Sequence, residues 1–331
     1  MAKVNIIEYI TIASTGNATD FGNLHTGTDA AASCSNSTRN ITGGGEESYP
    51  SGGTDRIQYV TIASTGNATD FGDLTIGMGN HSSGSSTTRG IWAGGVQWGV
   101  GDTNVISYVT IASTGNATDF GDATVTGDEH PAGASSNTRF LRGGGMTINV
   151  IDYITTATTG NATDFGDLTV ARGRLSATSN KDTYGVFIGG YNSNVIDYVT
   201  MSSTGNASDW GDCDVNLMHA GALSNNHGGL DGWSFSPPPG KAFWHGGATS
   251  GDNRRNDIQT ITFATLGDAT DYGDLTATRF KLSGCSNSTR GLSIGGRESS
   301  DVNTIDYYDL TSSGNASDFG DLTAAVQGPS A

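Results

Sequence analysis

The sequence predicts an all-β fold in which small antiparallel sheets form a ring, and two observations support this. A 19-residue segment, RIQYVTIASTGNATDFGDL in its second copy, is present seven times, at 6–24, 56–74, 105–123, 150–168, 195–213, 257–275 and 304–322. Two or three consecutive glycines lie between each copy and the next. Repeats of roughly 50 residues with strand-like composition are typical of β-propeller blades. We therefore expect residues 1–331 to form a single β-propeller domain.

Each repeat is predicted to contain four strands, as the stretch 169–212 illustrates. TVARGRLSATSN contains a short strand of small residues, and TYGVFIGG is a second strand that ends in two glycines. In the third strand, NVIDYVTMSS, Ile196 and Tyr198 lie on the face opposite to Asp197. TGNAS is a turn, because Gly and Asn tolerate positive φ, and DWGDC is a short outer strand.

Glycines and arginines recur at fixed positions around the second strand. The structural glycines at its end include Gly44, Gly95, Gly144, Gly190, Gly247 and Gly296. A Thr-Arg pair precedes four of these strands and contributes Arg39, Arg89, Arg139 and Arg290. The arginines have two interpretations: they line one face and bind an anionic partner, or each pairs with a repeat aspartate of a neighbouring blade. The second is favoured in an acidic protein.

The order of these features resembles the blade of kelch-type β-propellers. Arg172 and Arg279 fit the arginine that follows the outer strand, Gly189–Gly190 fits the glycine pair, and Phe165 or Trp210 fits the late aromatic residue. The segment GNATDFGDL is more uniform than kelch repeats usually are. In this respect the chain is similar to repeats in virion structural and fibre-like proteins of marine phages that infect cyanobacteria. The resemblance covers essentially the whole chain and implies a structural component of a virion.

The count of hairpins leaves the closure of the ring open. Seven copies of the outer hairpin are present, but only six inner segments with a glycine pair lie between them. We expect a near-closed, seven-fold propeller in which the C-terminal tail completes the first blade. The alternatives are six full blades with an extra hairpin, or a spare edge that pairs with a neighbouring subunit, because an unpaired strand edge is adhesive. The number of blades depends on whether residues 324–331 adopt an ordered structure beside residues 3–12.

The acidity of the chain belongs to the repeat. The net charge is −17, and the aspartates of the DFGD-type segments supply 13 of the 33 acidic residues, seven at the first position and six at the second. This balance argues against nucleic-acid binding, which needs a basic surface. The N-terminus shows no signal segment, and the sequence shows no apolar run long enough to span a membrane. We expect a chain that is made in the host cytoplasm, does not insert into membranes and is located in the virion.

Several recurring residues invite a site interpretation, and each also has a structural one. Paired aspartates such as Asp70 and Asp73 are too few per hairpin for calcium, so we expect a solvated rim and no metal. The Asn-Ala-Thr/Ser triplets match a glycosylation acceptor but are interpreted as turns. Of Cys34, Cys213 and Cys285, the first and last lie at matching positions of distant repeats, so we expect no bridge between them and no disulfide framework, and we interpret them as small buried residues of an inner strand.

The insertion 214–256 is the one break in the pattern. It lengthens one repeat step to 62 residues and contains Trp233, Phe235, Trp244 and His245. Insertions in repeat proteins often lie on the binding face, and Trp92 and Trp98 are candidates to extend the same surface. The alternative is a packing loop whose aromatic residues are buried against blade edges. The histidines of the insertion show no convincing metal-ligand spacing.

No nucleophile motif, phosphate loop or cofactor motif is evident, so we expect no enzyme and no cofactor. The predicted function is a virion structural or adhesive propeller, associated with a fibre, a tail or a capsid. Its expected partners are other virion proteins or further copies of itself, and in addition a host glycan. The alternative is a free carbohydrate-binding or scaffold propeller. The fold alone does not choose between them, because propellers carry many functions.

Overall fold

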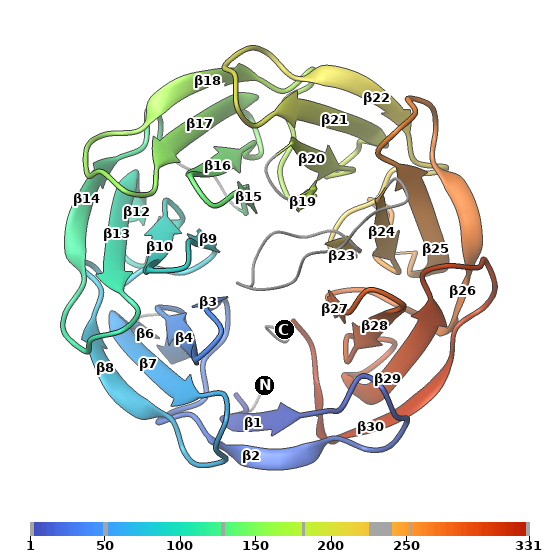
Figure 1. The fold of residues 1–331 in the computed structure, drawn as a ribbon, viewed down its shortest axis with the longest axis horizontal. Coiled ribbons are helices and arrows are strands. Elements are labelled where there is room, and N and C mark those ends of the chain that lie inside the picture. Colours follow the sequence, from blue (N-terminus) through green and yellow to red (C-terminus); the bar gives the residue numbers. More distant parts are fainter. Residues whose placement is uncertain are drawn as a thin grey trace.

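The protein is a ring of small antiparallel sheets around a common axis (Figure 1). The computed structural model describes residues 3–48, 52–126, 130–180, 183–224, 240–251 and 253–328, and these residues form strands and turns but no helix. The predicted β-propeller of four-stranded blades is confirmed.

Six blades contain four strands each, and in each blade the first strand along the chain lies innermost. Blades 1 to 3 are β3 (Ala32–Ser35), β4 (Arg39–Gly43), β7 (Arg56–Thr61), β8 (Thr69–Asp73); β9 (Ser82–Ser85), β10 (Arg89–Ala93), β13 (Val105–Thr110), β14 (Thr118–Asp122); and β15 (Ala132–Ser135), β16 (Arg139–Gly143), β17 (Val150–Thr155), β18 (Thr163–Asp167). Blades 4 to 6 are β19 (Ser176–Asn180), β20 (Tyr184–Ile188), β21 (Val195–Thr200), β22 (Ser208–Asp212); β23 (Gly221–Ser224), β24 (Lys241–His245), β25 (Arg255–Thr262), β26 (Thr270–Arg279); and β27 (Ser283–Ser286), β28 (Arg290–Ile294), β29 (Val302–Asp309), β30 (Ser317–Val326). Two short hairpins, β5 (Glu46–Ser48) with β6 (Gly52–Gly53) and β11 (Val96–Gln97) with β12 (Gly101–Asp102), extend the connections of blades 1 and 2.

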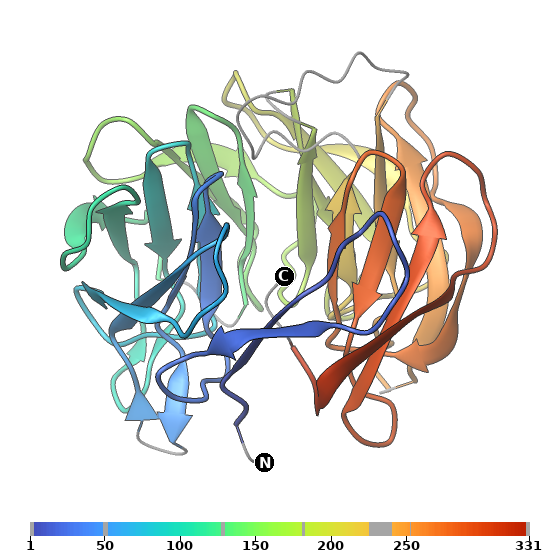
Figure 2. The ribbon, with the colours of Figure 1, turned by 60° about the horizontal axis from the view of Figure 1, so that its bottom comes forward.

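The seventh position of the ring holds an outer hairpin only. β1 (Ile6–Tyr9) and β2 (Thr19–Asn23) pair with each other and lie between blades 6 and 1. Figure 2 shows β1 crossing the interval between these two blades. Within the described residues, the preferred expectation of seven complete blades is therefore not met: the ring has six complete blades and the extra hairpin named as the alternative.

The repeated TGNATDFGD segment links each outer hairpin to the preceding one. At the junction of the chain ends, the Gly16 and Ala18 amides donate to the Phe319 and Asp321 carbonyls, both at 2.8 Å. The side chain of Asn17 accepts a hydrogen bond from the Asp321 amide at 3.1 Å. The same three bonds recur at the junctions within the chain, where Asp268 takes the place of the asparagine once. All seven outer hairpins thus form one closed belt.

This belt explains why the segment contains a glycine before its last aspartate. A Cβ added to Gly320 would lie 2.5 Å from the carbonyl carbon and oxygen of Gly16. At Gly166, inside the chain, it would lie 2.4 Å from the Gly205 oxygen. Real Cβ atoms do not approach backbone this closely, so a side chain here would force neighbouring hairpins apart. The uniformity of the repeat follows from this contact and from the Asn bond.

The core lies in layers between neighbouring blades. Between blades 1 and 2 the layer contains Ile41, Ile57, Phe71 and Trp92, all buried. Three layers also include a buried ion pair: Arg142 with Asp152 at 2.8 Å, Arg172 with Asp197 at 2.7 Å, and Arg279 with Asp306. Each aspartate also accepts a bond from a threonine hydroxyl at the end of the preceding outer strand, which ties the strands of adjacent blades together.

Candidate docking site

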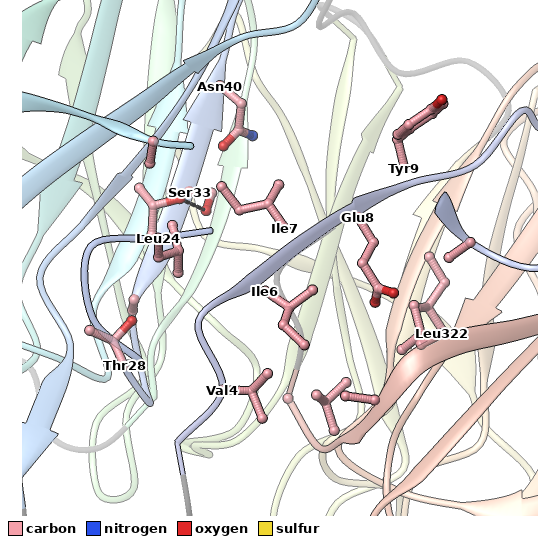
Figure 3. Close-up of a pocket in the computed structure, with 18 of the residues that line it drawn as sticks. Val4, Ile6, Ile7, Glu8, Tyr9, Leu24, Thr28, Ser33, Asn40 and Leu322 are labelled. Carbon is pink, nitrogen blue, oxygen red and sulfur yellow. Dashed lines mark hydrogen bonds between the residues drawn. The ribbon is translucent and has the colours of Figure 1, made fainter. Parts of the chain in front are cut away.

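A cavity of about 540 Å³ lies on the inner side of β1, at the seventh position of the ring. We call it the seventh-blade cavity. Residues of blade 1, of blade 6 and of the tail 324–328 line it together with β1. In the close-up, Ile6 and Ile7 lie between Ser33 and Asn40 of blade 1 on one side and Leu322 of β30 on the other (Figure 3). The other six positions of the ring hold an inner hairpin at this place.

Side chains in and beside the cavity are more exposed than their repeat equivalents, and they include Ile62, which follows the lining residue Val60 by two positions but does not itself line the cavity. Ile62, just after β7, is 46% exposed. The residues at the same repeat position of blades 2 to 6 are at most 6% exposed: Ile111, Thr156, Met201, Phe263 and Leu310. Ile7 and Val60 are half-buried, whereas their equivalents in the remaining repeats are buried. What differs at these positions is the covering hairpin.

Cys34 and Cys285, which occupy the same repeat position, differ in burial in the same way. Cys34 in β3 is buried under blade 2, where a Cβ on Gly90 would approach its sulfur to 2.5 Å. Cys285 occupies the same position in β27 but lines the seventh-blade cavity and is half-buried. Burial raises the pKa of the Cys34 thiol to about 12 and that of Cys285 to about 11. Both, like Cys213, are free thiols.

The repeat arginines bind backbone, which corrects the expectation that they pair with repeat aspartates. Arg39 donates to the Ile111 carbonyl of the next blade at 2.8 Å, and its guanidinium lies 4.5 Å above the ring centre of Tyr59. Equivalent bonds at 2.8–2.9 Å join Arg89 to Thr156, Arg139 to Met201 and Arg290 to Ile12. Each arginine therefore joins one inner hairpin to the blade that follows it.

At the seventh position, the described residues include no such arginine. Its two targets are nevertheless present. The ring of Tyr9, at the position equivalent to Tyr59, is 43% exposed, and the Ile62 carbonyl is the equivalent of the Ile111 carbonyl. By repeat position, the seventh place in the ring thus retains both groups that a repeat arginine contacts elsewhere. Sequence reasoning did not single out these residues, although the excess of one outer hairpin indicated their region.

The tail reaches the point where an innermost strand would begin. Just before each of the six innermost strands, one residue adopts a left-handed backbone: Ala30, Asn80, His130, Arg174, His219 and Lys281. Gly328 repeats this conformation, with φ +61°, and its amide donates to the Lys281 carbonyl as Lys281 does to His219. Gly328 is therefore the seventh member of this series.

The aromatic binding candidates have different locations. Trp92, Trp244 and His245 are completely buried between blades, as the packing alternative requires. His245 Nδ1 lies 2.9 Å from the Tyr308 hydroxyl, and burial together with Arg279 lowers the pKa of His245 to about 3. Trp98 is half-buried beside Gly53 and Gly79 and stays a candidate.

The remaining two binding candidates, Trp233 and Phe235, lie outside the described residues. The structural glycines Gly44, Gly95, Gly144, Gly190, Gly247 and Gly296 all have positive φ, with values from 68° to 130°. Gly44 has φ +68° and Gly144 has φ +78°, which a side chain would strain.

Other site types receive no geometric support within the described residues. No group of three or more His, Cys, Asp or Glu side chains there could hold a metal ion. That part of the chain also has no helix that is long and apolar enough to cross a membrane. Comparison with protein-family models and with curated proteins finds no match to this sequence. The seventh-blade cavity is therefore characterised from its own geometry.

Proposed function

We propose that this chain is a non-enzymatic, structural propeller that assembles with another polypeptide through the seventh-blade cavity. The observation that carries the proposal is that Val60 and Tyr9, which line the cavity, and Ile62 beside them are more exposed than the residues at the same repeat positions of blades 2 to 6. An open strand edge beside apolar side chains is an adhesive surface. The outer belt holds the walls in place, so the site is preformed, which lowers the entropic cost of association.

The particular role that we propose is that of a virion component, in a fibre, a tail or a capsid-associated layer, and the location is the virion. Its partners are other virion proteins or further copies of the chain, and its outer loops contact the host surface. Two sequence features support this role: the kelch-like blade and the resemblance of the uniform repeat to virion structural proteins. The net charge of −17 favours a soluble surface and disfavours nucleic acid as a partner.

Incorporation into particles tests the proposal. Wild-type chain, Val60→Arg and Val170→Arg are supplied during infection, and their copies per purified particle are counted by quantitative mass spectrometry. Val60 faces the cavity, whereas Val170 is an exposed valine that does not line it, so Val170→Arg is the matched control. We expect wild type and Val170→Arg at a fixed copy number and loss of Val60→Arg. Absence of the wild-type chain from particles, or normal incorporation of Val60→Arg, contradicts the proposal.

A further inference from the structure

We infer that the occupant of the seventh-blade cavity is a β-hairpin of the repeat's own inner type, supplied by another polypeptide. This inference rests on the proposed function and names the chemistry of the partner. The hairpin would have two strands of four or five residues, an arginine at the start of the second and glycines at its end. Ser283–Ile294, which forms β27 and β28, is one of the six inner hairpins of the ring and one of the four that begin their second strand with an arginine.

The backbone of β1 offers the matching edge. In blade 6, the second strand pairs with the third in the register Arg290 with Asp309, Leu292 with Tyr307 and Ile294 with Ile305. By repeat position, Tyr307 corresponds to Tyr9 and Ile305 to Ile7. In the described residues β1 pairs with β2 alone, so its inner edge is open to a strand in this register. Addition of a strand to an open edge supplies backbone hydrogen bonds without a demand for one exact sequence.

An arginine would select hairpins of this type. In the four blades that carry it, the guanidinium lies 4.5–5.1 Å above a tyrosine ring and donates to a carbonyl of the next blade. By repeat position, the same pair of targets at the seventh position is the Tyr9 ring, which lines the cavity, and the Ile62 carbonyl. A donated arginine would make both contacts at once. A hydrogen bond from a charged guanidinium to a carbonyl is stronger than one between two neutral groups, and the cation–π contact with the tyrosine ring adds further binding free energy.

The side walls favour an apolar hairpin with small residues. Val60 of blade 1 and Cys285 and Leu322 of blade 6 line the cavity, and none of the three is fully buried. Their repeat equivalents are covered by the alternating side chains of an inner hairpin. Occupation of the cavity would bury these three side chains in the same way, which is the main driving force expected for binding.

A peptide titration on the full chain tests the inference. The peptide has the sequence of residues 283–296, SGCSNSTRGLSIGG, with a fluorescent label, and its anisotropy is followed in reducing buffer as the chain is added. We expect saturable binding to wild type and to Val170→Arg, and loss of binding to Val60→Arg. The same peptide with Arg290→Ala should bind with an affinity that is lower by about tenfold or more. The peptide variant leaves the protein unchanged, so its result does not depend on how a mutant chain folds.

The outcomes separate this inference from the proposed function. Absence of peptide binding, or equal binding of the Arg290→Ala peptide, overturns the hairpin as occupant even when the chain is packaged into particles. The inference is also overturned if light scattering gives the mass of two chains for wild type and Val170→Arg but the mass of one chain for Val60→Arg. A second copy of the chain would then fill the cavity. Arginine-dependent binding supports the hairpin even when the chain is absent from particles, in which case only the proposed function fails.

Discussion

Substitution of Gly320 by alanine should open the ring at the junction of its first and last hairpins. The new Cβ would lie 2.5 Å from the carbonyl group of Gly16 and 2.7 Å from the amide nitrogen of Asn17. Relief of this overlap requires that the hairpin 6–24 moves away from blade 6. Three hydrogen bonds at the junction are then lost: Gly16 to Phe319, Ala18 to Asp321, and Asp321 to the Asn17 side chain.

The expected cost follows from these contacts. Each of the three hydrogen bonds contributes about 1 kcal/mol net, and a non-glycine residue at φ +146° adds about 1–2 kcal/mol of strain, so the free energy of unfolding should fall by about 4–5 kcal/mol. Urea unfolding followed by tryptophan fluorescence measures it. Gly314→Ala is the control, because a Cβ there has no atom within 4 Å, and its change should stay below about 1 kcal/mol.

A second comparison isolates closure of the ring. Gly166 makes the equivalent contact inside the chain, where a Cβ would lie 2.4 Å from the Gly205 oxygen, so Gly166→Ala should cost a similar amount. A large loss for Gly166→Ala together with a negligible loss for Gly320→Ala would refute the reasoning. It would mean that the first hairpin does not close the ring in solution.

Three further predictions concern the interior. Asp197→Ala leaves the Arg172 guanidinium buried without its partner and should lower the free energy of unfolding by about 3–5 kcal/mol, against little change for the exposed Asp209→Ala, and equal urea midpoints would contradict this. Because the pKa of His245 falls from 6.5 to about 3 on folding, the unfolded chain binds more protons than the folded chain between these pH values. From pH 7 to pH 5 the free energy of unfolding of wild type should therefore fall by about 2 kcal/mol more than that of His245→Gln. Equal decreases for the two proteins would contradict this prediction. Native protein treated with a thiol reagent should be modified at Cys285 well before Cys34 and Cys213, as read by peptide mass spectrometry, whereas equal rates at Cys34 and Cys285 would show that both are covered alike.

The repeat made much of the fold predictable. The hairpin at 195–213 was expected to form a third and a fourth strand around the turn TGNAS, and these strands are β21 and β22. Glycine pairs marked the end of each second strand, and six pairs correspond to six complete blades. These features were legible because strand alternation and turn chemistry act over a few residues.

The contacts between blades were harder to predict, because they join residues some 40 to 70 positions apart. Arg39 was expected to meet an aspartate but binds the Ile111 carbonyl and the Tyr59 ring. Trp92 was a binding candidate but packs over Gly43, where a Cβ would lie 2.9 Å from its ring. Phe187 lies over Gly143 in the same way. In both cases a glycine ends a second strand, and the aromatic residue lies in the second strand of the next repeat. This pairing of a glycine with a large aromatic residue would have indicated that the aromatic residue is buried.

The location of the candidate site was predictable only in outline. The sequence contains one more outer hairpin than inner ones, and this excess defined an open position. It did not reveal that the belt closes around that position, because the closing bonds join residues about 300 positions apart. The walls of the cavity, including Val60 and Tyr59, belong to repeats that look ordinary in sequence. Their exposure depends on an absent neighbour and not on their own residue type.

Hydrogen exchange along the third strands tests the open seventh position most directly. The isolated chain is studied at a concentration where light scattering gives 34.0 kDa, and exchange of the segment 6–12 is compared with that of 105–111 and 150–156 by mass spectrometry. The two reference segments are paired on both edges, whereas β1 is paired on one. We expect residues 6–12 to exchange about tenfold faster or more. Equal protection of all three segments would show that the seventh blade is complete in the single chain and would contradict the account.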